Sequence, residues 1–240
     1  MKDISGKVAL ITGGSKGIGF GIADELMKAG VNVVVTSRSQ VSADQAATQL
    51  NDKNSTSKAI GVKADVRILL DQEEAVRKAI ETFGQLDYVI ANAGLAHFAS
   101  IEDMSDSQWK EVIDTNLTGV FYSIKASVEA LKGSKGYFVS ISSLAGTNFF
   151  AKGSAYNASK FGVTGFTQSI MLDLREKGVN VTTIMPGSVS SHFNGNEPDE
   201  SDAWKIQPED IGELIVDVFK MNERALPSKI EIRPSRPKSK

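Results

Sequence analysis

The sequence predicts an α/β fold in which a doubly wound parallel sheet of about seven strands is flanked by helices on both faces. Short apolar, β-branched runs alternate with longer stretches whose apolar residues recur at helical spacing. This alternation is typical of right-handed crossovers that build a parallel sheet, and near-continuous apolar strands fit burial on both faces. The predicted strands are Val8 to Ile11, Val31 to Val35, Ala59 to Val62, Leu86 to Ala91, Tyr137 to Ile141, Val179 to Ile184 and Ile230 to Ile232.

Length and composition indicate a single domain over residues 1–240. The 240 residues, 41% of them hydrophobic, suffice for one sizeable core, and no repeat or low-complexity linker divides them. The polar, acidic segment 188–207 is expected to form a surface loop or a lid. The basic, proline-containing end, Arg233 to Lys240, is expected to be an exposed, flexible tail.

Charge and cysteine content exclude several classes of function. The 27 basic residues nearly balance 29 acids, so the chain has no broad attraction for nucleic acid or anionic membranes. Without cysteine, and with only His97 and His192, a metal site is not expected. No apolar run approaches the roughly 18 residues of a membrane span, and the start lacks a secretory pattern. A cytoplasmic protein is therefore expected.

A glycine-rich stretch, Thr12 to Gly19, follows the first predicted strand and leads directly into a helical pattern. Here Gly13 can make a tight turn, Gly17 lets the backbone approach a pyrophosphate, and Gly19 permits close helix-to-strand packing. An ordinary glycine-rich connection is the alternative, but the order strand, loop, helix favours a dinucleotide. The residues predicted to bind it are Gly13, Ser15, Lys16, Gly17, Ile18 and Gly19.

The end of the second predicted strand indicates which dinucleotide is bound. It reads Thr36-Ser37-Arg38-Ser39, where an NAD-binding protein usually has an acid against the ribose 2′-hydroxyl. Arg38 instead offers a forked, permanently charged donor for a 2′-phosphate, and Lys16 adds a second cation. Each cation alone is equally typical of a solvated loop. Their joint placement predicts NADP(H), with Ser37 and Arg38 among its contacts.

Tyr156 and Lys160 lie four residues apart in a long helical pattern from about Ser154 to Lys177, and therefore share one helix face. A lysine cation beside a tyrosine favours the phenolate and lowers the pKa of the phenol from about 10. Tyr156 is thus a candidate general acid or base. By itself this spacing equally suits a half-buried aromatic residue beside a solvated lysine.

Together these motifs resemble the short-chain dehydrogenase/reductase family, in particular its NADP(H)-preferring members similar to 3-oxoacyl-ACP reductases. The resemblance extends over nearly the whole chain. The glycine stretch and Tyr156-x-x-x-Lys160 match two family motifs. The other matches are Asn92-Ala93-Gly94 after the fourth strand, Asn116 in Asp114-Thr115-Asn116-Leu117, and Ser143 after the fifth strand.

The resemblance implies a Rossmann-like fold and a role for each of four catalytic residues. Tyr156 exchanges the proton, and Ser143 hydrogen-bonds the substrate oxygen. Lys160 binds the nicotinamide ribose and tunes Tyr156, while Asn116 supports a water-linked proton path. Ser142 is the alternative to Ser143, which is preferred because its distance from Tyr156 along the chain agrees with the family spacing.

The resemblance implies further contacts to the cofactor along the same edge of the sheet. Asp65 and Val66 match family positions that flank the adenine, although Asp65 would also suit a helix cap. Asn92 is expected to support the cofactor site, and a purely structural role is nearly as plausible. Ser191 replaces a threonine that is common in relatives. The implied contacts are Asp65, Val66, Asn92, Ala93, Gly94, Tyr156, Lys160, Pro186, Gly187, Val189 and Ser191.

The expected function is reduction of a ketone or aldehyde to an alcohol, or the reverse, with NADP(H). The substrate is expected between His97 or Phe98, the segment from Ser143 to Phe150, and the segment Ser188 to Trp204, with both histidines as loop or pocket-wall residues. A catalytically silent NADP(H)-binding regulator is the alternative. An epimerase or lyase is a third class, and relatives that epimerise sugars generally have a larger substrate domain.

The family resemblance also implies assembly with copies of the same chain. Its members form homodimers or homotetramers through their longest helices, which here correspond to Gln108 to Leu131 and Ser154 to Lys177. The chain ends in Arg-Pro-Ser-Arg-Pro rather than in a glycine-rich finish. A homodimer is therefore preferred to a homotetramer.

Overall fold

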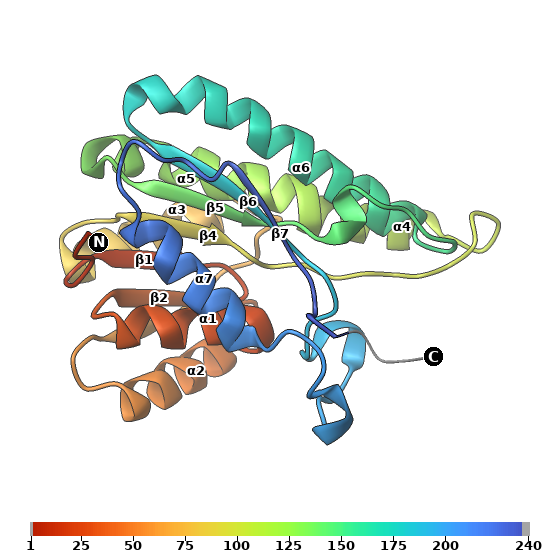
Figure 1. The fold of residues 1–240 in the computed structure, drawn as a ribbon, viewed down its shortest axis with the longest axis horizontal. Coiled ribbons are helices and arrows are strands. Elements are labelled where there is room, and N and C mark those ends of the chain that lie inside the picture. Colours follow the sequence, from red (N-terminus) through yellow and green to blue (C-terminus); the bar gives the residue numbers. More distant parts are fainter. Residues whose placement is uncertain (1, 237–240) are drawn as a thin grey trace.

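A seven-stranded parallel sheet forms the centre of the computed structural model, which describes residues 2–236 (Figure 1). The strand order is β3-β2-β1-β4-β5-β6-β7, and every neighbouring pair is parallel. This arrangement confirms the predicted fold class. The strands are β1 (Val8–Ile11), β2 (Asn32–Ser37), β3 (Ala59–Lys63), β4 (Tyr88–Ala91), β5 (Tyr137–Ile141), β6 (Asn180–Pro186) and β7 (Lys229–Ile232).

Helices cover both faces of the sheet, with α1, α2 and α7 on one side and α3, α4, α5 and α6 on the other (Figure 1). Each crossover returns the chain to the end of the sheet at which the next parallel strand begins, as parallel pairing requires. The helices are α1 (Gly17–Lys28), α2 (Gln40–Lys53), α3 (Leu69–Phe83), α4 (Asp106–Ile113), α5 (Gly119–Ser134), α6 (Ser154–Leu174) and α7 (Pro208–Lys220).

The alternation of side chains along β1 explains why its sequence is apolar without interruption. Ala9 and Ile11 pack into the core on the side of α1 and α7, whereas Val8 and Leu10 pack into the core on the side of α3 and α5. Successive side chains of a strand point to opposite faces, so a strand with two buried faces needs apolar residues at every position.

The helix expected over roughly Gln108 to Leu131 is present, but a turn of π-helix interrupts its α-helical geometry. The chain forms α4, then one turn of π-helix at Asp114–Thr118, and then α5. Isolated π-helical turns within α-helices are frequent at functional sites. This turn contains Asn116, which the family resemblance assigns to the catalytic group, and its amide side chain leaves the helix to bond neighbouring segments.

The segment 188–207 is a loop, as expected, and it is closed at its base. The backbone N–H of Ser190 donates to the carbonyl of Ile206 over 2.8 Å, and that of Ile206 donates to Ser188 over 3.1 Å. Two short 3₁₀ turns, Phe193–Gly195 and Glu200–Asp202, lie within it. Of the predicted tail, residues 237–240 lie outside the described residues. Within residues 2–236, no helix has both the length and the apolar character that a membrane span requires.

Candidate active site

The structure brings the predicted site residues together at one edge of the sheet. All seven strands run in the same direction, so the segments that follow them emerge at their carboxyl ends. The order of the strands reverses between β1 and β4, and ligands of open α/β sheets bind outside such a point. The segments at this edge are Gly13 to Gly19, Ser37 and Arg38, Asp65 and Val66, Asn92 to Gly94, Ser143, and Pro186 to Ser191.

The glycine loop has the geometry predicted for a phosphate cradle. Gly13 and Gly17 have φ values of 63° and 56°, in the left-handed region that favours glycine. A Cβ on Gly19 would lie 2.5 Å from the carbonyl oxygen of Gly13. The loop therefore requires glycine at these positions, and it presents the N-terminus of α1 to the sheet edge, where backbone N–H groups favour an anion.

Asn92 joins the glycine loop to the end of β4. Its Nδ2 donates to the carbonyl oxygens of Thr12, at 2.9 Å, and Gly13, at 3.2 Å. The Oγ1 of Thr12 in turn accepts from the backbone N–H groups of Asn92 and Ala93. The Nδ2 group of Asn92 holds two loops together, which is the structural role considered from the sequence.

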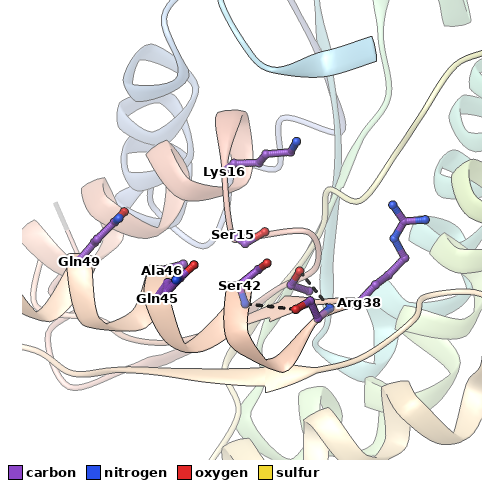
Figure 2. Close-up of a pocket in the computed structure, with 9 residues that line it drawn as sticks. Ser15, Lys16, Arg38, Ser42, Gln45, Ala46 and Gln49 are labelled. Atoms are coloured by element: carbon purple, nitrogen blue, oxygen red, sulfur yellow. Dashed lines mark hydrogen bonds between the residues drawn. The ribbon is translucent and has the colours of Figure 1, made fainter. Parts of the chain in front are cut away.

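A cavity of about 470 Å³ lies between the glycine loop, the end of β2 and the first turns of α2. Lys16 and Arg38 stand on its rim, and Figure 2 shows both side chains extending toward the same side. Within the described residues neither forms an ion pair, so both cations are available to an anion. The full lining is Ser15, Lys16, Ser37, Arg38, Ser39, Ser42, Gln45, Ala46 and Gln49.

Helix α2 supplies the part of this cavity that the sequence analysis missed. Ser42, Gln45 and Gln49 recur at helical spacing, and the Oγ of Ser39 caps the helix by accepting from the backbone N–H of Ser42. The cap is recognisable from the sequence as a serine before a helical pattern. That these polar residues face the glycine loop depends on how α2 packs, which spacing alone does not show.

Asp65 is held by an arginine and does not cap the next helix. The N-cap of α3 is Ile68, whereas the carboxylate of Asp65 accepts hydrogen bonds from the guanidinium of Arg67. The Arg67 guanidinium is the main cause that holds the pKa of Asp65 below its ordinary value. Val66 is buried against Gly119 of α5 and supports this corner of the site.

Ser143, and not Ser142, faces Tyr156. The Ser143 hydroxyl lies near the phenol of Tyr156 and lowers its pKa, and it accepts a 3.1 Å hydrogen bond from the N–H of Ala145. The Ser142 hydroxyl lies beneath α6, where it bonds the carbonyl oxygen of Lys160 at 3.1 Å and the hydroxyl of Thr164 at 3.0 Å. Adjacent residues after a strand point to opposite sides, so only one of the two serines can reach the site.

Lys160 is buried behind Tyr156. Its Nζ lies 5.7 Å from the centroid of the Tyr156 ring and donates a 2.9 Å hydrogen bond to the carbonyl oxygen of Ile141. Burial lowers the pKa of Lys160 to about 8. The ammonium group is therefore confined to a position between β5 and the tyrosine.

The expectation that Lys160 lowers the pKa of Tyr156 is wrong for the chain alone. Burial raises the pKa of the phenol, and the neighbouring Ser143 hydroxyl lowers it by less. Desolvation disfavours the charged phenolate, and the lysine is itself desolvated and bonded to Ile141. In this chain Tyr156 is consequently protonated at neutral pH.

Asn116 fastens the segment after β4 to helix α6. Its Oδ1 accepts from the backbone N–H of Leu95 at 2.9 Å, while its Nδ2 donates to the carbonyl of Leu95 at 2.8 Å and to the hydroxyl of Ser159 at 3.0 Å. Ser159 donates onward to the carbonyl oxygen of Tyr156. The side chain of Asn116 thus holds the segment after β4 against α6, and a role in a proton path stays a prediction.

The residues after β6 approach the glycine loop from the opposite side. A Cβ on Gly17 would lie 3.4 Å from the Cβ of Ser191, which places the two loops in contact. Gly187 follows Pro186 and packs near Leu144, whereas Val189 packs against the core beneath α1 and α7. Gly187 therefore lies near the segment after β5, and Ser191 lies near the glycine loop.

Each histidine pairs with a glutamate outside the catalytic group. His97 Nε2 lies 2.8 Å from Glu111 of α4, and His192 Nδ1 lies 3.6 Å from Glu197 within the loop 188–207. The hydrogen bond from His97 is the main cause that lowers the pKa of Glu111. These contacts agree with the expected placement of both histidines in loops.

Comparison with known proteins identifies the family. Residues 7–202 match the family model described as short chain dehydrogenase. The chain is 32% identical over 235 residues to an uncharacterised oxidoreductase of Staphylococcus saprophyticus, which covers 98% of this chain and 100% of the relative. It is 35% identical over 192 residues to trans-4-hydroxycyclohexanecarboxylate dehydrogenase of Sinomonas cyclohexanicum, covering 78% of this chain and 74% of that protein.

A solved structure shows the same arrangement over nearly the whole chain. The alcohol dehydrogenase of the archaeon Thermococcus sibiricus, complexed with 5-hydroxy-NADP, superposes with a TM-score of 0.89 at 28% identity. The match covers 97% of this chain and 99% of the other. The family match, the relatives and the shared fold all agree with the Rossmann-like sheet described above. The chain belongs to the short-chain dehydrogenase/reductase family of oxidoreductases.

Proposed function

We propose that this protein reduces a ketone or aldehyde to an alcohol, or catalyses the reverse reaction, with NADP(H) as its cofactor. The observation that carries the proposal is the contact between the Ser143 hydroxyl and the Tyr156 phenol, with Lys160 buried behind the same ring. A protonated phenol and a second hydroxyl can both meet one substrate oxygen. This pair lies at the sheet edge that also contains the glycine loop.

The residues of the glycine loop and of β2 fit NADP(H). Lys16 and Arg38 offer two unpaired cations at one cavity, and hydroxyl groups of Ser15, Ser39 and Ser42 add donors for phosphate oxygens. An acid that would bond a ribose 2′-hydroxyl and repel a 2′-phosphate is absent from this rim. The Thermococcus sibiricus alcohol dehydrogenase with its bound 5-hydroxy-NADP supports the same choice.

The side chains of this site supply the proton for the reaction. Bound NADPH supplies the hydride that the carbonyl carbon receives. Tyr156, protonated at neutral pH because burial raises its pKa, donates its proton to the carbonyl oxygen. Ser143 donates a hydrogen bond to that oxygen and holds it beside the phenol. Lys160 would hold the nicotinamide ribose beside Tyr156, and in the reverse direction the phenolate takes the proton back from the alcohol.

The test follows the absorbance of NADPH and NADH with a panel of ketones, aldehydes, quinones and 3-oxoacyl thioesters. Tyr156→Phe should abolish turnover while it leaves NADPH binding intact. Tyr122→Phe on α5, a tyrosine outside the group of Ser143, Tyr156 and Lys160, is the matched control and should retain activity. Tight NADPH binding without turnover of any substrate would support the alternative, a catalytically silent regulator.

A homodimer through the face formed by α4, α5 and α6 is part of the proposal. Large apolar side chains are exposed on this face at Trp109, Phe121, Phe161 and Leu172, with exposed fractions of 39, 43, 44 and 55%. Exposed apolar groups that gather on adjacent elements mark association surfaces. The same helices were expected to form the subunit contact. The cytoplasmic location stays a prediction.

A further inference from the structure

Three phenylalanine side chains from separate parts of the chain form one cluster of ring contacts with Tyr156. Phe98, after β4, lies with its centroid 5.8 Å from that of Tyr156 in an edge-on arrangement. Phe150, before α6, packs edge-on against Phe98 at 5.8 Å. Phe193, in the loop 188–207, lies 5.7 Å from Tyr156 on a tilted plane. We call Phe98, Phe150 and Phe193 the aromatic rim.

Backbone hydrogen bonds hold two members of the rim in place. The N–H of Ala99 donates to the carbonyl of Lys152 at 3.0 Å, which ties the segment of Phe98 to that of Phe150. The amide of Asn157 donates to the carbonyls of Ala145 and Asn148 at 2.8 Å each, and its Oδ1 accepts from the N–H of Phe150. The rim is therefore built by the fold, and its geometry exists before a ligand binds.

The rim presents apolar surface beside a reactive phenol. Phe98 and Phe150 are 45 and 49% exposed despite their ring contacts. Water meets this surface unless a ligand covers it, and an apolar ligand gains free energy by doing so. Aromatic rings add a preference for flat partners, since edge-to-face and offset contacts stabilise a pair beyond burial alone.

The loop that contributes Phe193 is acidic, and one exposed cation, Lys152, follows Phe150. The loop that contributes Phe193 holds four carboxylates in residues 188–207 against one lysine, Lys205, which pairs with Asp202 at 2.6 Å. Lys160 is buried and bonded to Ile141. The phenol of Tyr156 has a pKa set by burial and by Ser143, with no contribution from a charged side chain in the described part of the chain.

We infer that the preferred substrates are uncharged carbonyl compounds that carry a flat apolar ring, such as aryl ketones and aryl aldehydes. This inference rests on the proposed carbonyl reduction and names its substrate class. The aromatic rim contacts the ring of the substrate, while Tyr156 and Ser143 meet its carbonyl oxygen. Small polar carbonyl compounds leave the rim uncovered, and anionic ones meet an acidic loop.

Kinetics with matched substrates and matched variants test the inference. The wild type should use acetophenone with a kcat/KM at least about 10-fold above that for acetone. Phe98→Ala and Phe150→Ala should each reduce kcat/KM for acetophenone about 5- to 10-fold, mainly through KM, and change that for acetone less than about 2-fold. Phe149→Ala is the control, because Phe149 adjoins Phe150, is 85% exposed and has no ring contact within residues 2–236.

A second pair of substrates tests the effect of the charge of the substrate. The sequence relative from Sinomonas cyclohexanicum is named for a carboxylate-bearing ring alcohol, so 4-oxocyclohexanecarboxylate and 4-methylcyclohexanone are compared. The uncharged ketone should have the higher kcat/KM. Preference for the carboxylate, equal use of acetone and acetophenone, or an equal loss in the Phe149 and Phe150 variants would each overturn the inference.

Binding of an unreactive probe separates this inference from the proposed reaction. The dissociation constant of benzamide is measured by titration calorimetry on the NADPH complex, with acetamide as the small comparison. Benzamide binding that weakens in Phe150→Ala and persists in Phe149→Ala supports the inference even if no carbonyl compound is turned over. Turnover of small carbonyl compounds, without tighter binding of benzamide than acetamide, supports the reaction and overturns the substrate class.

Discussion

Arg67 forms a bidentate ion pair with the carboxylate of Asp65, with its Nε 2.9 Å from one oxygen and its Nη2 2.6 Å from the other. The pair stands beside β2, where the positive charge of Arg38 also lowers the pKa of Asp65. Without Arg67, the negative charge of Asp65 would act on Arg38 and on any phosphate that Arg38 binds. We therefore expect Arg67 to influence cofactor binding, although it does not line the cavity beside Arg38.

Replacing Arg67 by alanine should weaken NADPH binding about 3-fold and NADH binding less, because a partly exposed ion pair contributes little by itself. Dissociation constants from fluorescence titration measure the effect. Arg77→Ala is the control, since Arg77 also pairs with acids, Glu74 and Glu81, but lies within α3. Equal losses in both variants would show that Asp65 and Arg67 are not coupled to the phosphate site.

Arg38→Asp should weaken NADPH binding by roughly 10- to 100-fold and narrow or reverse the preference over NADH, because a charge-assisted contact to the 2′-phosphate is lost and a repulsive charge replaces it. Arg224→Asp makes the same change of charge at an exposed residue after α7 and should leave the preference unaltered. A preference unchanged in Arg38→Asp would remove Arg38 from the proposed phosphate site.

The depressed pKa of Lys160 should appear in the pH dependence of stability. Burial lowers this pKa from 10.5 to about 8, so between these values the unfolded chain binds more protons than the folded one. The contribution of Lys160 to the free energy of unfolding therefore rises with pH between these values, by up to about 1.4 kcal/mol per pH unit. Below pH 8 both states are protonated, and the cost of burying the charge is present in full.

Denaturant unfolding of the wild type and of Lys160→Met at pH 7.5, 8.5 and 9.5 measures this effect as a difference. Staying below pH 10 avoids the buried tyrosines, whose raised pKa values would act in the opposite direction. The stability of the wild type relative to Lys160→Met should increase with pH. A constant or decreasing difference would contradict a lysine buried against Ile141.

Gly19→Ala should lower both cofactor affinity and the free energy of unfolding. Its Cβ would lie 2.5 Å from the Gly13 carbonyl oxygen and 2.6 Å from Nδ2 of Asn92, so the glycine loop must move. Gly133→Ala in α5 meets no atom within 4 Å and should stabilise the protein by about 0.5 to 1 kcal/mol, as glycine-to-alanine changes do in helices. Thermal unfolding with and without NADPH compares the two. Unaltered NADPH binding in Gly19→Ala would contradict the assigned loop.

The proposed dimer makes a prediction about exposed apolar residues. Phe121→Asp and Phe161→Asp place charges on the face of α5 and α6 and should convert the protein to monomers, because a buried unpaired charge opposes association. Val41→Asp, at a residue 65% exposed on α2, is the control on the opposite side of the sheet. Analytical ultracentrifugation measures the mass. A wild type that sediments as a monomer would refute the dimer.

The strands could be predicted because parallel strands buried on both faces leave a local signature. Val8 to Ile11 and Tyr137 to Ile141 have the same bounds in the sequence prediction and in the structure. The edge strand β7 alternates between exposed and half-buried positions, and its Ile230 and Ile232 were still sufficient to predict a strand. The glycine loop could also be predicted from the sequence, because positive φ values and close packing require glycine at particular positions.

The helix containing Asn116 shows where local patterns fail. Periodicity spans Gln108 to Leu131 without a break, and no proline or glycine marks Asp114–Thr118. The π-helical turn is stabilised by contacts across the fold, in which the Asn116 side chain bonds Leu95 and Ser159. Tertiary hydrogen bonds of this kind override the preference of the segment for a regular helix.

The sequence by itself determined the order of strands and helices and the glycine loop, because spacing and backbone requirements are local, and the family resemblance supplied the other residues that meet at the sheet edge. Only the tertiary structure decided which of Ser142 and Ser143 faces Tyr156, and in which direction burial moves the pKa of the phenol. It also gathered Phe98, Phe150 and Phe193 around the site. Desolvation and ring contacts arise between segments far apart in the chain, and no local pattern records them.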